Sequence, residues 1–246
     1  MGQQLQGKVA VVSGAARGLG AAWVEAMRDE GATVVGFDIR EGADIVADTS
    51  EPADVRRVVD TIVSRHGGID IAIANAGEVR STNPLDPWEK ALADFDLQIG
   101  TNLKGAFLLG RAVAPIMVER GGGDIVNIST DHVLPPPGRR TGGGAVMDVY
   151  DASKWGLRGL TEAWALALAK HRIRVNELCM GATDAPMLRN FLGDRFKPEM
   201  AEGWMRPEAL AAVLVELLLE GPDGRTGEQI GFWVDHAVRL PERTKP

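Results

Sequence analysis

The chain has 246 residues, of which 45% are hydrophobic and 25% charged, so it can bury a sizeable core and is not disordered. Its net charge of -7 disfavours nucleic acid and anionic membranes as partners, and its single cysteine, Cys179, excludes an internal disulfide framework. The polar residues 1–7 do not resemble a signal peptide, and no apolar run reaches the roughly 18 residues of a membrane span. We therefore expect a cytoplasmic protein, and the scattered histidines predict no metal site.

Short apolar runs alternate along the chain with segments of helical periodicity. This alternation predicts a parallel sheet with helices on both faces, in a single α/β domain over residues 1–246. For residues 87–118 the pattern leaves open whether 88–95 form a separate short helix. The expected strands are 8–13, 33–37, 44–47, 69–74, 124–129, 173–179 and 229–234, and the expected helices are 21–29, 54–65, 87–118, 149–170 and 207–219.

Two irregular stretches each follow the carboxyl end of an expected strand, the edge at which open α/β sheets bind ligands. Residues 134–147 are rich in proline and glycine, and residues 184–203 mix apolar and charged side chains. We expect the second stretch to be a substrate lid that ends before Trp204, and its apolar residues favour an apolar or aromatic substrate. They are Met187, Leu188, Phe191, Leu192 and Phe196, which alternatively only pack beneath the lid.

A glycine-rich turn connects the first expected strand to the first expected helix. Gly14, Gly18 and Gly20 follow a GxxxGxG spacing, which allows a sharp turn and a close approach of the backbone to a pyrophosphate. The N-terminus of the following helix offers free N–H groups to the same phosphates. The turn therefore predicts a dinucleotide site rather than a purely structural loop.

Asp38 closes the second expected strand, where an acidic residue is placed to bind the adenosine ribose hydroxyls. Its charge repels a 2′-phosphate, and the next residue, Ile39, offers no cation to accept one. These features predict NAD rather than NADP as cofactor, although the nearby cations Arg17 and Arg40 weaken the preference.

Tyr150 is the one tyrosine of the chain and begins an expected helix in which Lys154 follows four residues later. Residues at this spacing share a helix face, so the ammonium group is expected near the phenol, where it should lower the pKa of Tyr150 toward neutrality. A phenol tuned in this way can exchange a proton with an alcohol or ketone while hydride moves to or from its carbon.

These motifs together resemble the short-chain dehydrogenase/reductase family from residue 7 to about 234, and residues 150–160 are similar to bacterial hydroxysteroid dehydrogenases. The resemblance implies a Rossmann-type sheet with strand order 3-2-1-4-5-6-7 and a dehydrogenase of secondary alcohols. The matching residues are Gly14, Gly18, Gly20, Asp48, Asn75-Ala76-Gly77, Asn102, Asn127-Ile128-Ser129-Thr130, Tyr150, Ser153, Lys154 and Arg174-Val175-Asn176.

The resemblance also implies roles for individual residues. Tyr150 would be the acid/base, Lys154 would bind the nicotinamide ribose, Asn102 would hold a relay water, and Asp48 would contact the adenine. Alternatively, Asn102 only bends its helix and Asp48 caps the next one. The catalytic set is Asn102, Thr130, Tyr150 and Lys154, and the cofactor set adds Gly14, Arg17, Gly18, Leu19, Gly20, Asp38, Asp48, Thr49, Asn75, Ala76, Gly77, Gly181 and Thr183.

The sequence departs from the family pattern at several positions. Thr130 replaces the usual serine, with Ser129 as the alternative contact to the substrate oxygen, and Met180-Gly181 replaces Pro-Gly. A threonine that often binds the carboxamide aligns with Ala185, so Thr183 is expected to take its place. The 19 residues between Thr130 and Tyr150 are more than usual and suggest an unusual pocket. His132 is expected to be solvated, and Cys179 to be a buried, inert thiol.

The helices expected at 103–118 and 149–170 carry more apolar surface than one sheet face covers, which predicts a homotetramer or homodimer. The leading hypothesis is an NAD-dependent dehydrogenase of a hydrophobic cyclic or aromatic secondary alcohol. The alternatives are an NADPH-dependent ketone reductase and a weakly catalytic nucleotide-binding regulator.

Overall fold

A parallel sheet of seven strands forms the centre of the protein. The computed structural model describes residues 3–243, so both ends of the predicted 1–246 domain lie outside the described residues. The strand order is β3-β2-β1-β4-β5-β6-β7, which confirms the predicted Rossmann topology. The strands are β1 (Val9–Ser13), β2 (Thr33–Asp38), β3 (Ile45–Val46), β4 (Ile71–Ala74), β5 (Gly123–Thr130), β6 (Ile173–Met180) and β7 (Gln229–Phe232).

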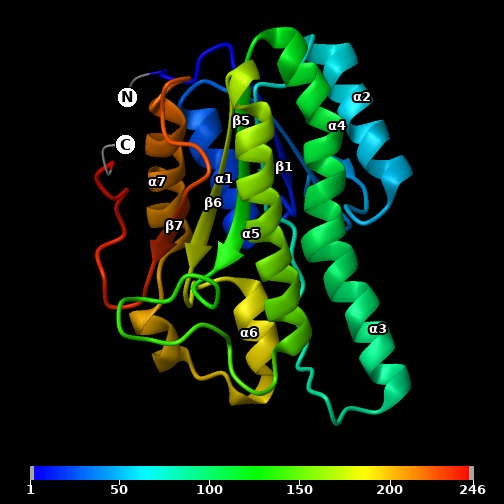
Figure 1. Ribbon diagram of the computed structural model, residues 1–246, viewed down its shortest axis with the longest axis vertical. Helices are drawn as coiled ribbons and strands as arrows, with labels where there is room; N and C mark the ends of the chain where they lie inside the picture. Colours follow the sequence, from blue (N-terminus) through cyan, green and yellow to red (C-terminus); the bar gives the residue numbers. More distant parts are fainter. Residues whose placement is uncertain (1–2, 244–246) are drawn as a thin grey trace.

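Helices cover both faces of the sheet and bury its apolar side chains. The helices α1 (Gly18–Asp29) and α7 (Pro207–Leu219) pack on one face, around Trp23 and Phe232. The helices α2 (Pro52–His66), α4 (Gly105–Arg120) and α5 (Asp148–Leu168) pack on the other, around Phe37 and Leu109. In Figure 1 the sheet lies between α1 and α7 on one side and α4 and α5 on the other. Every residue of β1, β4 and β6 is buried, and β1 and β4 are almost entirely apolar, whereas β6 also buries Arg174, Asn176 and Glu177.

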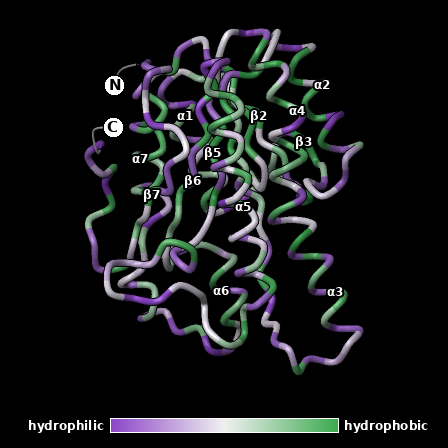
Figure 2. The backbone as a smooth tube through the Cα atoms, viewed as in Figure 1, coloured by the Kyte–Doolittle hydropathy of each residue, from purple (hydrophilic) through white to green (hydrophobic). Residues whose placement is uncertain are grey.

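The helical segment expected at 87–118 is continuous. Helix α3 (Trp88–Ile99) passes through a π-helical turn (Gly100–Lys104) directly into α4, so no separate short helix forms. A π turn adds one residue to the helical repeat and often occurs at functional sites. Figure 2 shows hydrophobic residues along α3, although this helix projects beyond the sheet. None of the helices in residues 3–243 is long and apolar enough to cross a membrane.

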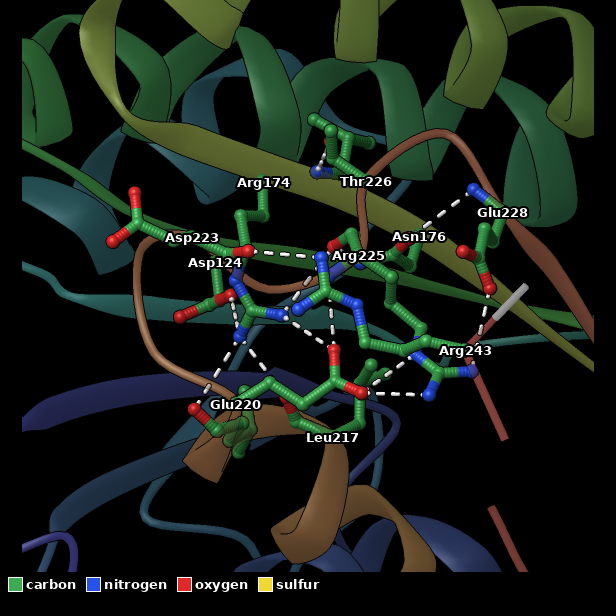
Figure 3. A network of polar contacts seen from close by, with 12 residues as sticks. Asp124, Arg174, Asn176, Leu217, Glu220, Asp223, Arg225, Thr226, Glu228 and Arg243 are labelled. Atoms are coloured by element: carbon green, nitrogen blue, oxygen red, sulfur yellow. Dashed lines mark hydrogen bonds and ion pairs between the residues drawn. The ribbon is translucent and has the colours of Figure 1, made fainter. Parts of the chain in front are cut away.

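The amino ends of β5 and β6 are tied to α7 by a buried ion network (Figure 3). Arg174 lies 2.6 Å from Asp124 and 3.5 Å from Glu220, and Arg225 lies 2.6 Å from Glu220. Only 2% of Arg174 and 4% of Arg225 is exposed. Burial raises the pKa of Asp124 to about 6, although the guanidinium of Arg174 opposes the shift. The network therefore stabilises the amino ends of the strands, whereas the irregular loops lie at their carboxyl ends.

Candidate active site

A cavity of about 660 Å³ opens at the carboxyl ends of the strands. This volume lies within the range of small-molecule and cofactor sites. In Figure 1 the arrowheads of β5 and β6 point to this end, where the loop before α5 and the helix α6 (Pro186–Leu192) also lie. The predicted site residues that line the cavity are Gly14, Arg17, Gly18, Leu19, Gly20, Asp38, Asp48, Thr49, Asn75, Ala76, Gly77, Thr130, Tyr150, Lys154, Gly181 and Thr183, whereas Asn102 lies behind its wall.

The glycine-rich turn is shaped for close packing. Gly14 and Gly18 have φ values of +66° and +57°, which favour glycine, and helix α1 begins at Gly18, three residues before the predicted start. A β-carbon on Gly20 would overlap the carbonyl oxygen of Gly14, and one on Gly14 would lie 2.8 Å from the α-carbon of Ala76. The turn therefore packs tightly on itself and against the end of β4, and its glycines line the cavity.

Asn75 fastens this turn to the end of β4. Its side-chain Nδ2 donates to the carbonyl oxygens of Ser13 and Gly14, at 2.9 and 3.1 Å. The Ser13 hydroxyl in turn accepts the backbone N–H groups of Asn75 and Ala76, each at 3.0 Å. The predicted role of residues 75–77 at the edge of the cofactor cradle is consistent with this geometry.

Asp38 is buried and holds the turn from the other side. Its Oδ2 accepts the Ala16 N–H at 3.2 Å, its Oδ1 accepts the Arg40 N–H at 3.0 Å, and the Arg40 guanidinium lies 3.8 Å from Oδ1. The Asp48 carboxylate accepts both the N–H and the hydroxyl of Ser50 at 2.8 Å. Both carboxylates therefore keep a fixed orientation along one wall of the cavity.

Tyr150, Lys154 and Thr130 meet at the other end of the cavity. The first two lie on one face of α5, and the Lys154 Nζ is 5.8 Å from the centre of the Tyr150 ring. Nζ also donates to the Ile128 carbonyl at 2.8 Å, which anchors it to β5. Thr130 lines the same end of the cavity, and its hydroxyl donates to the Asp131 carboxylate at 3.3 Å. A phenol, an amino group and a hydroxyl therefore lie together at this end of the cavity.

The expectation that Lys154 lowers the pKa of Tyr150 is wrong for the protein without cofactor. Burial raises the pKa of Tyr150 well above its ordinary value, the neighbouring Thr130 hydroxyl opposes this, and the carboxylates of Asp151 and Asp131 add to the rise. Burial likewise lowers the pKa of Lys154 to about 8, against the attraction of Glu177. Desolvation is the largest cause of both shifts, because both side chains are buried.

Asn102 lies in the π-helical turn and is 1% exposed. Its Oδ1 accepts the Glu78 N–H at 2.7 Å, and its Nδ2 donates to the Glu78 carbonyl at 2.9 Å and to the Ser153 hydroxyl at 3.0 Å. These bonds join the chain after β4 to helix α5. Asn102 thus binds Ser153, the residue before Lys154, and connects helix α5 to the segment after β4. The predicted relay water remains a prediction.

Ser129 and Thr130 point to different surroundings, as strand alternation predicts. Ser129 lies beside Glu177 and Cys179 under α5, whereas Thr130 lies beside Tyr150. Sequence reasoning missed Glu177, which is fully buried in β6 and has no hydrogen-bond partner for either oxygen among the described residues. Burial raises the pKa of Glu177 to about 7. Ser129 and the positive charges of Lys154 and Arg158 lower this pKa, and the negative charge of Glu162 raises it further. Cys179 is a buried free thiol, as predicted.

The two irregular stretches border the cavity. Loop 134–147 is held at Leu134, whose carbonyl accepts the Trp233 Nε1–H at 2.8 Å, and at Val146, whose carbonyl accepts the Thr82 N–H at 2.9 Å. Met187, Leu188 and Phe191 of α6 line the cavity, while Phe196 packs against Trp204 with ring centres 5.7 Å apart. The apolar residues of stretch 184–203 are thus divided between the cavity and the packing beneath it.

The segment after β6 completes the cavity. The Thr183 hydroxyl donates to the Gly181 carbonyl at 3.1 Å, and both residues line the wall. A β-carbon on Gly181 would lie 2.9 Å from the Asp131 carboxylate, which would have to move to make room for it. In residues 3–243 no cluster of three or more histidine, cysteine, aspartate or glutamate side chains is suited to a metal ion.

The fold and the cavity together define a dinucleotide-binding protein with a tyrosine–lysine pair at one end of its cleft. A model of the short chain dehydrogenase family matches residues 8–195, and the chain belongs to this family of oxidoreductases, whose members bind a nicotinamide cofactor.

Three known proteins illustrate the similarity. A 3-alpha-(or 20-beta)-hydroxysteroid dehydrogenase of Mycobacterium bovis is 38% identical over 96% of this chain and 90% of its own. A 3-oxoacyl-[acyl-carrier-protein] reductase of Thermotoga maritima is 31% identical over 93% and 97%. The crystal structure of a 3-ketoacyl-(acyl-carrier-protein) reductase from Brucella melitensis complexed with NADH has a TM-score of 0.78 at 28% identity, covering 93% of this chain and 98% of that one.

Proposed function

We propose that the protein is an NAD-dependent dehydrogenase that interconverts a secondary alcohol and its ketone. The observation that carries the proposal is the convergence of Tyr150, Lys154 and Thr130 at one end of a cavity whose other end is the glycine-rich turn. When bound, the nicotinamide supplies or accepts the hydride. The rest of the reaction requires a proton and a fixed position for the substrate oxygen, and both come from this chain.

Tyr150 is the acid/base of the proposed reaction. Its phenol donates a proton to the ketone oxygen, or its phenolate takes one from the alcohol, while the Thr130 hydroxyl bonds the same oxygen. Because burial raises the pKa of Tyr150, the neutral phenol is the resting form, and ketone reduction needs no further activation. Alcohol oxidation needs the positive charges of Lys154 and of an oxidised cofactor to stabilise the phenolate.

Lys154 and Asn102 have supporting roles. Lys154 would bind the nicotinamide ribose from its anchor on the Ile128 carbonyl, and Asn102 would position α5 through Ser153. Substitution of Tyr150 by Phe should abolish turnover and leave cofactor binding nearly intact. Turnover by this variant would contradict the mechanism.

The residues along the cavity fit a dinucleotide. Gly14, Gly18 and Gly20 line the cavity with backbone that has no side chains, and the helix that begins there presents its amino end. The buried Asp38 carboxylate would bind the adenosine ribose hydroxyls and repel a 2′-phosphate, which supports NAD over NADP. The Brucella relative was solved with NADH. Arg17 and Arg40 line the same region and are the cations that would favour NADPH.

The substrate end of the cavity is bordered by Met147, Met180, Met187, Leu188 and Phe191. This apolar border supports a hydrophobic cyclic or aromatic substrate, and the likeness to a hydroxysteroid dehydrogenase is in keeping with it. We also propose that residues 1–246 act as one domain and that stretch 184–203 serves as its lid.

The exposed apolar residues support assembly into a homotetramer or homodimer. Trp88 and Leu92 of α3, Phe107 of α4, and Trp155 and Leu166 of α5 expose between 41% and 84% of their surface. Light scattering of the purified protein tests this proposal, since a monomer at micromolar concentration would contradict it.

The experiment that tests the function is a titration of the purified protein with NADH and NADPH, followed by tryptophan and nicotinamide fluorescence. Tight binding of NADH and weak binding of NADPH supports Asp38 as the selecting residue and leads to a screen of hydrophobic secondary alcohols. Preference for NADPH would mean that Arg17 or Arg40 overrides Asp38. Binding of neither would overturn the cofactor assignment and the enzyme function with it.

A further inference from the structure

His132 lies against the proposed acid/base. It follows β5 by two residues, lines the cavity, and packs its imidazole edge-on to the Tyr150 ring, with ring centres 5.8 Å apart and an interplanar angle of 77°. Its side chain is 22% exposed, so the expectation of a solvated loop histidine is wrong. His132 has no role in the reaction proposed above.

Asp151 fixes the orientation of the imidazole. This residue follows Tyr150 in α5, and its Oδ1 lies 2.7 Å from the His132 Nδ1. Its Oδ2 accepts the Gly143 N–H at 2.7 Å, and the His132 carbonyl accepts the Gly142 N–H at the same distance. A β-carbon on Gly143 would overlap the imidazole ring. The ring is therefore held by α5 on one side and by loop 134–147 on the other.

This arrangement determines which ring nitrogen can act as an acceptor. An ionised carboxylate only accepts hydrogen bonds, so the hydrogen lies on Nδ1, and Nε2 of the neutral imidazole carries a lone pair. The nearest carboxylate oxygen to Nε2 is that of Asp131, at 4.0 Å, which is beyond hydrogen-bond distance. Within residues 3–243, Nε2 therefore makes no hydrogen bond and remains available as an acceptor.

We propose that the Nε2 of His132 binds a second oxygen of the substrate, a hydroxyl group that donates to it. The inference rests on the proposed function, because the reacting oxygen must lie beside residues 130 and 150 for His132 to meet another one. It deepens that function by naming the substrate class: secondary alcohols that carry a further hydroxyl group, and the hydroxy-ketones that correspond to them. An ether oxygen or a carbonyl at the same place would face the lone pair and gain nothing.

The first test compares substrates that differ only in the second group. Cyclohexanediols with the hydroxyls at positions 1,2, 1,3 or 1,4 are assayed against their monomethyl ethers and against cyclohexanol. We expect at least one diol to exceed its ether in kcat/KM by tenfold or more, because only the diol can donate to Nε2. If every diol and its ether react equally well, Nε2 does not accept a hydrogen bond, and the inference is overturned.

The second test uses two variants that separate the nitrogens of the ring. In His132→Asn the amide nitrogen can replace Nδ1 and keep the bond to Asp151, whereas Nε2 is lost. In His132→Gln the amide oxygen reaches the position of Nε2, whereas the bond to Asp151 is lost. We expect the diol-to-ether ratio to fall to near one in the Asn variant and to persist in part in the Gln variant. If the ratio persists in the Asn variant and falls to near one in the Gln variant, His132 serves only to hold loop 134–147 in place.

A binding measurement distinguishes a failure of this inference from a failure of the proposed function. The Tyr150→Phe protein, loaded with NADH, is titrated with 2-, 3- and 4-hydroxycyclohexanone and with the matching methoxycyclohexanones, and nicotinamide fluorescence is followed. A dissociation constant at least tenfold lower for one of the hydroxy ligands supports the role of His132 without any turnover. Equal constants in all three pairs would overturn it. Wild-type protein that binds NADH but oxidises or reduces none of these compounds would overturn the proposed function alone.

Discussion

The indole N–H of Trp23 donates a hydrogen bond of 3.0 Å to the side-chain oxygen of Asn75. Trp23 is fully buried in α1, and the same Asn75 holds the carbonyl oxygens of Ser13 and Gly14. A residue of the core thereby sets the position of the amide that shapes the cofactor cradle. Packing and cofactor binding are coupled at this point, and the coupling can be measured.

Asn75→Ala should weaken both stability and NADH binding. It leaves the Trp23 N–H without its partner and frees the Gly14 carbonyl, at a cost of roughly 1–3 kcal/mol in the free energy of unfolding. Denaturant unfolding and NADH titration measure the two effects. Trp23→Phe is the matched control, since it removes the indole N–H and keeps the bonds of Asn75 to the turn. It should lower stability with a smaller loss of NADH affinity, and equal losses would argue against a role for the turn.

Tyr150 can be titrated directly because the chain has one tyrosine. Burial raises the pKa of Tyr150 in the free protein, so phenolate absorbance should be absent below pH 10. The positive charge of bound NAD should shift the onset of phenolate to lower pH. Tyr150→Phe supplies the background spectrum. Phenolate in the free protein at pH 8 would contradict the burial argument.

Glu177→Gln should stabilise the protein more at pH 8 than at pH 5. Burial raises the pKa of Glu177 from 4.5 to about 7, so between these values the folded protein holds a proton that the unfolded chain releases. The free energy of unfolding therefore falls as the pH rises through this window, and glutamine removes the loss, which amounts to roughly 1–3 kcal/mol. Thermal unfolding at both pH values measures it, with the exposed Glu25→Gln as control. A gain independent of pH would show that Glu177 is not ionised at pH 8.

Asp38→Asn should shift cofactor preference toward NADPH. The amide keeps the size of the side chain and one oxygen for the Ala16 N–H, but it removes the charge that repels a 2′-phosphate. One charge at hydrogen-bond range contributes about 1–4 kcal/mol, so the NADPH-to-NADH affinity ratio should rise about tenfold or more. Glu41→Gln removes an exposed charge close by that does not line the cavity. A similar shift in this control would indicate a general effect of net charge.

Arg174→Met should destabilise the protein by about 3–5 kcal/mol, because it leaves the largely buried Asp124 carboxylate without its ion-pair partner and leaves Glu220 with Arg225 alone. Arg57→Met breaks the exposed pair with Asp54 and should cost no more than about 1 kcal/mol. Urea unfolding compares the two variants. Similar small losses would mean that water or Arg225 compensates for the missing guanidinium.

The sequence predicted the fold because strand burial and helix periodicity are local signals. The strand order followed from the family resemblance, and the predicted ends of most elements lay within two residues of the observed ones. Helix α1 is an exception, since Gly18 and Gly20 are poor helix formers. Gly18 is accommodated there by packing against Ala185 and Pro186, and Gly20 by packing against Gly14 and Asn75. Tertiary contact decides that boundary, and no local pattern reveals it.

The candidate site was predictable where a motif fixes both residue type and spacing, as for Tyr150, Lys154 and the glycines. The residues that escaped prediction act through partners distant in sequence. His132 meets Asp151 across the long loop, and Glu177 reaches its neighbours from another strand. The raised pKa of Tyr150 was also missed, because the degree of burial depends on the whole cavity and not on the Lys154 spacing.

The ion network of Arg174 and Arg225 lies at the edge of the sheet opposite the cavity. The residues that hold these strands to α7 and the residues that border the substrate therefore lie at opposite ends of the strands. Loop 134–147 and stretch 184–203 can consequently be shortened, exchanged or randomised in the laboratory while the opposite edge keeps β5, β6 and α7 together. The protein therefore offers a scaffold for directed evolution toward new alcohols, in which libraries confined to those two segments should yield mostly folded variants.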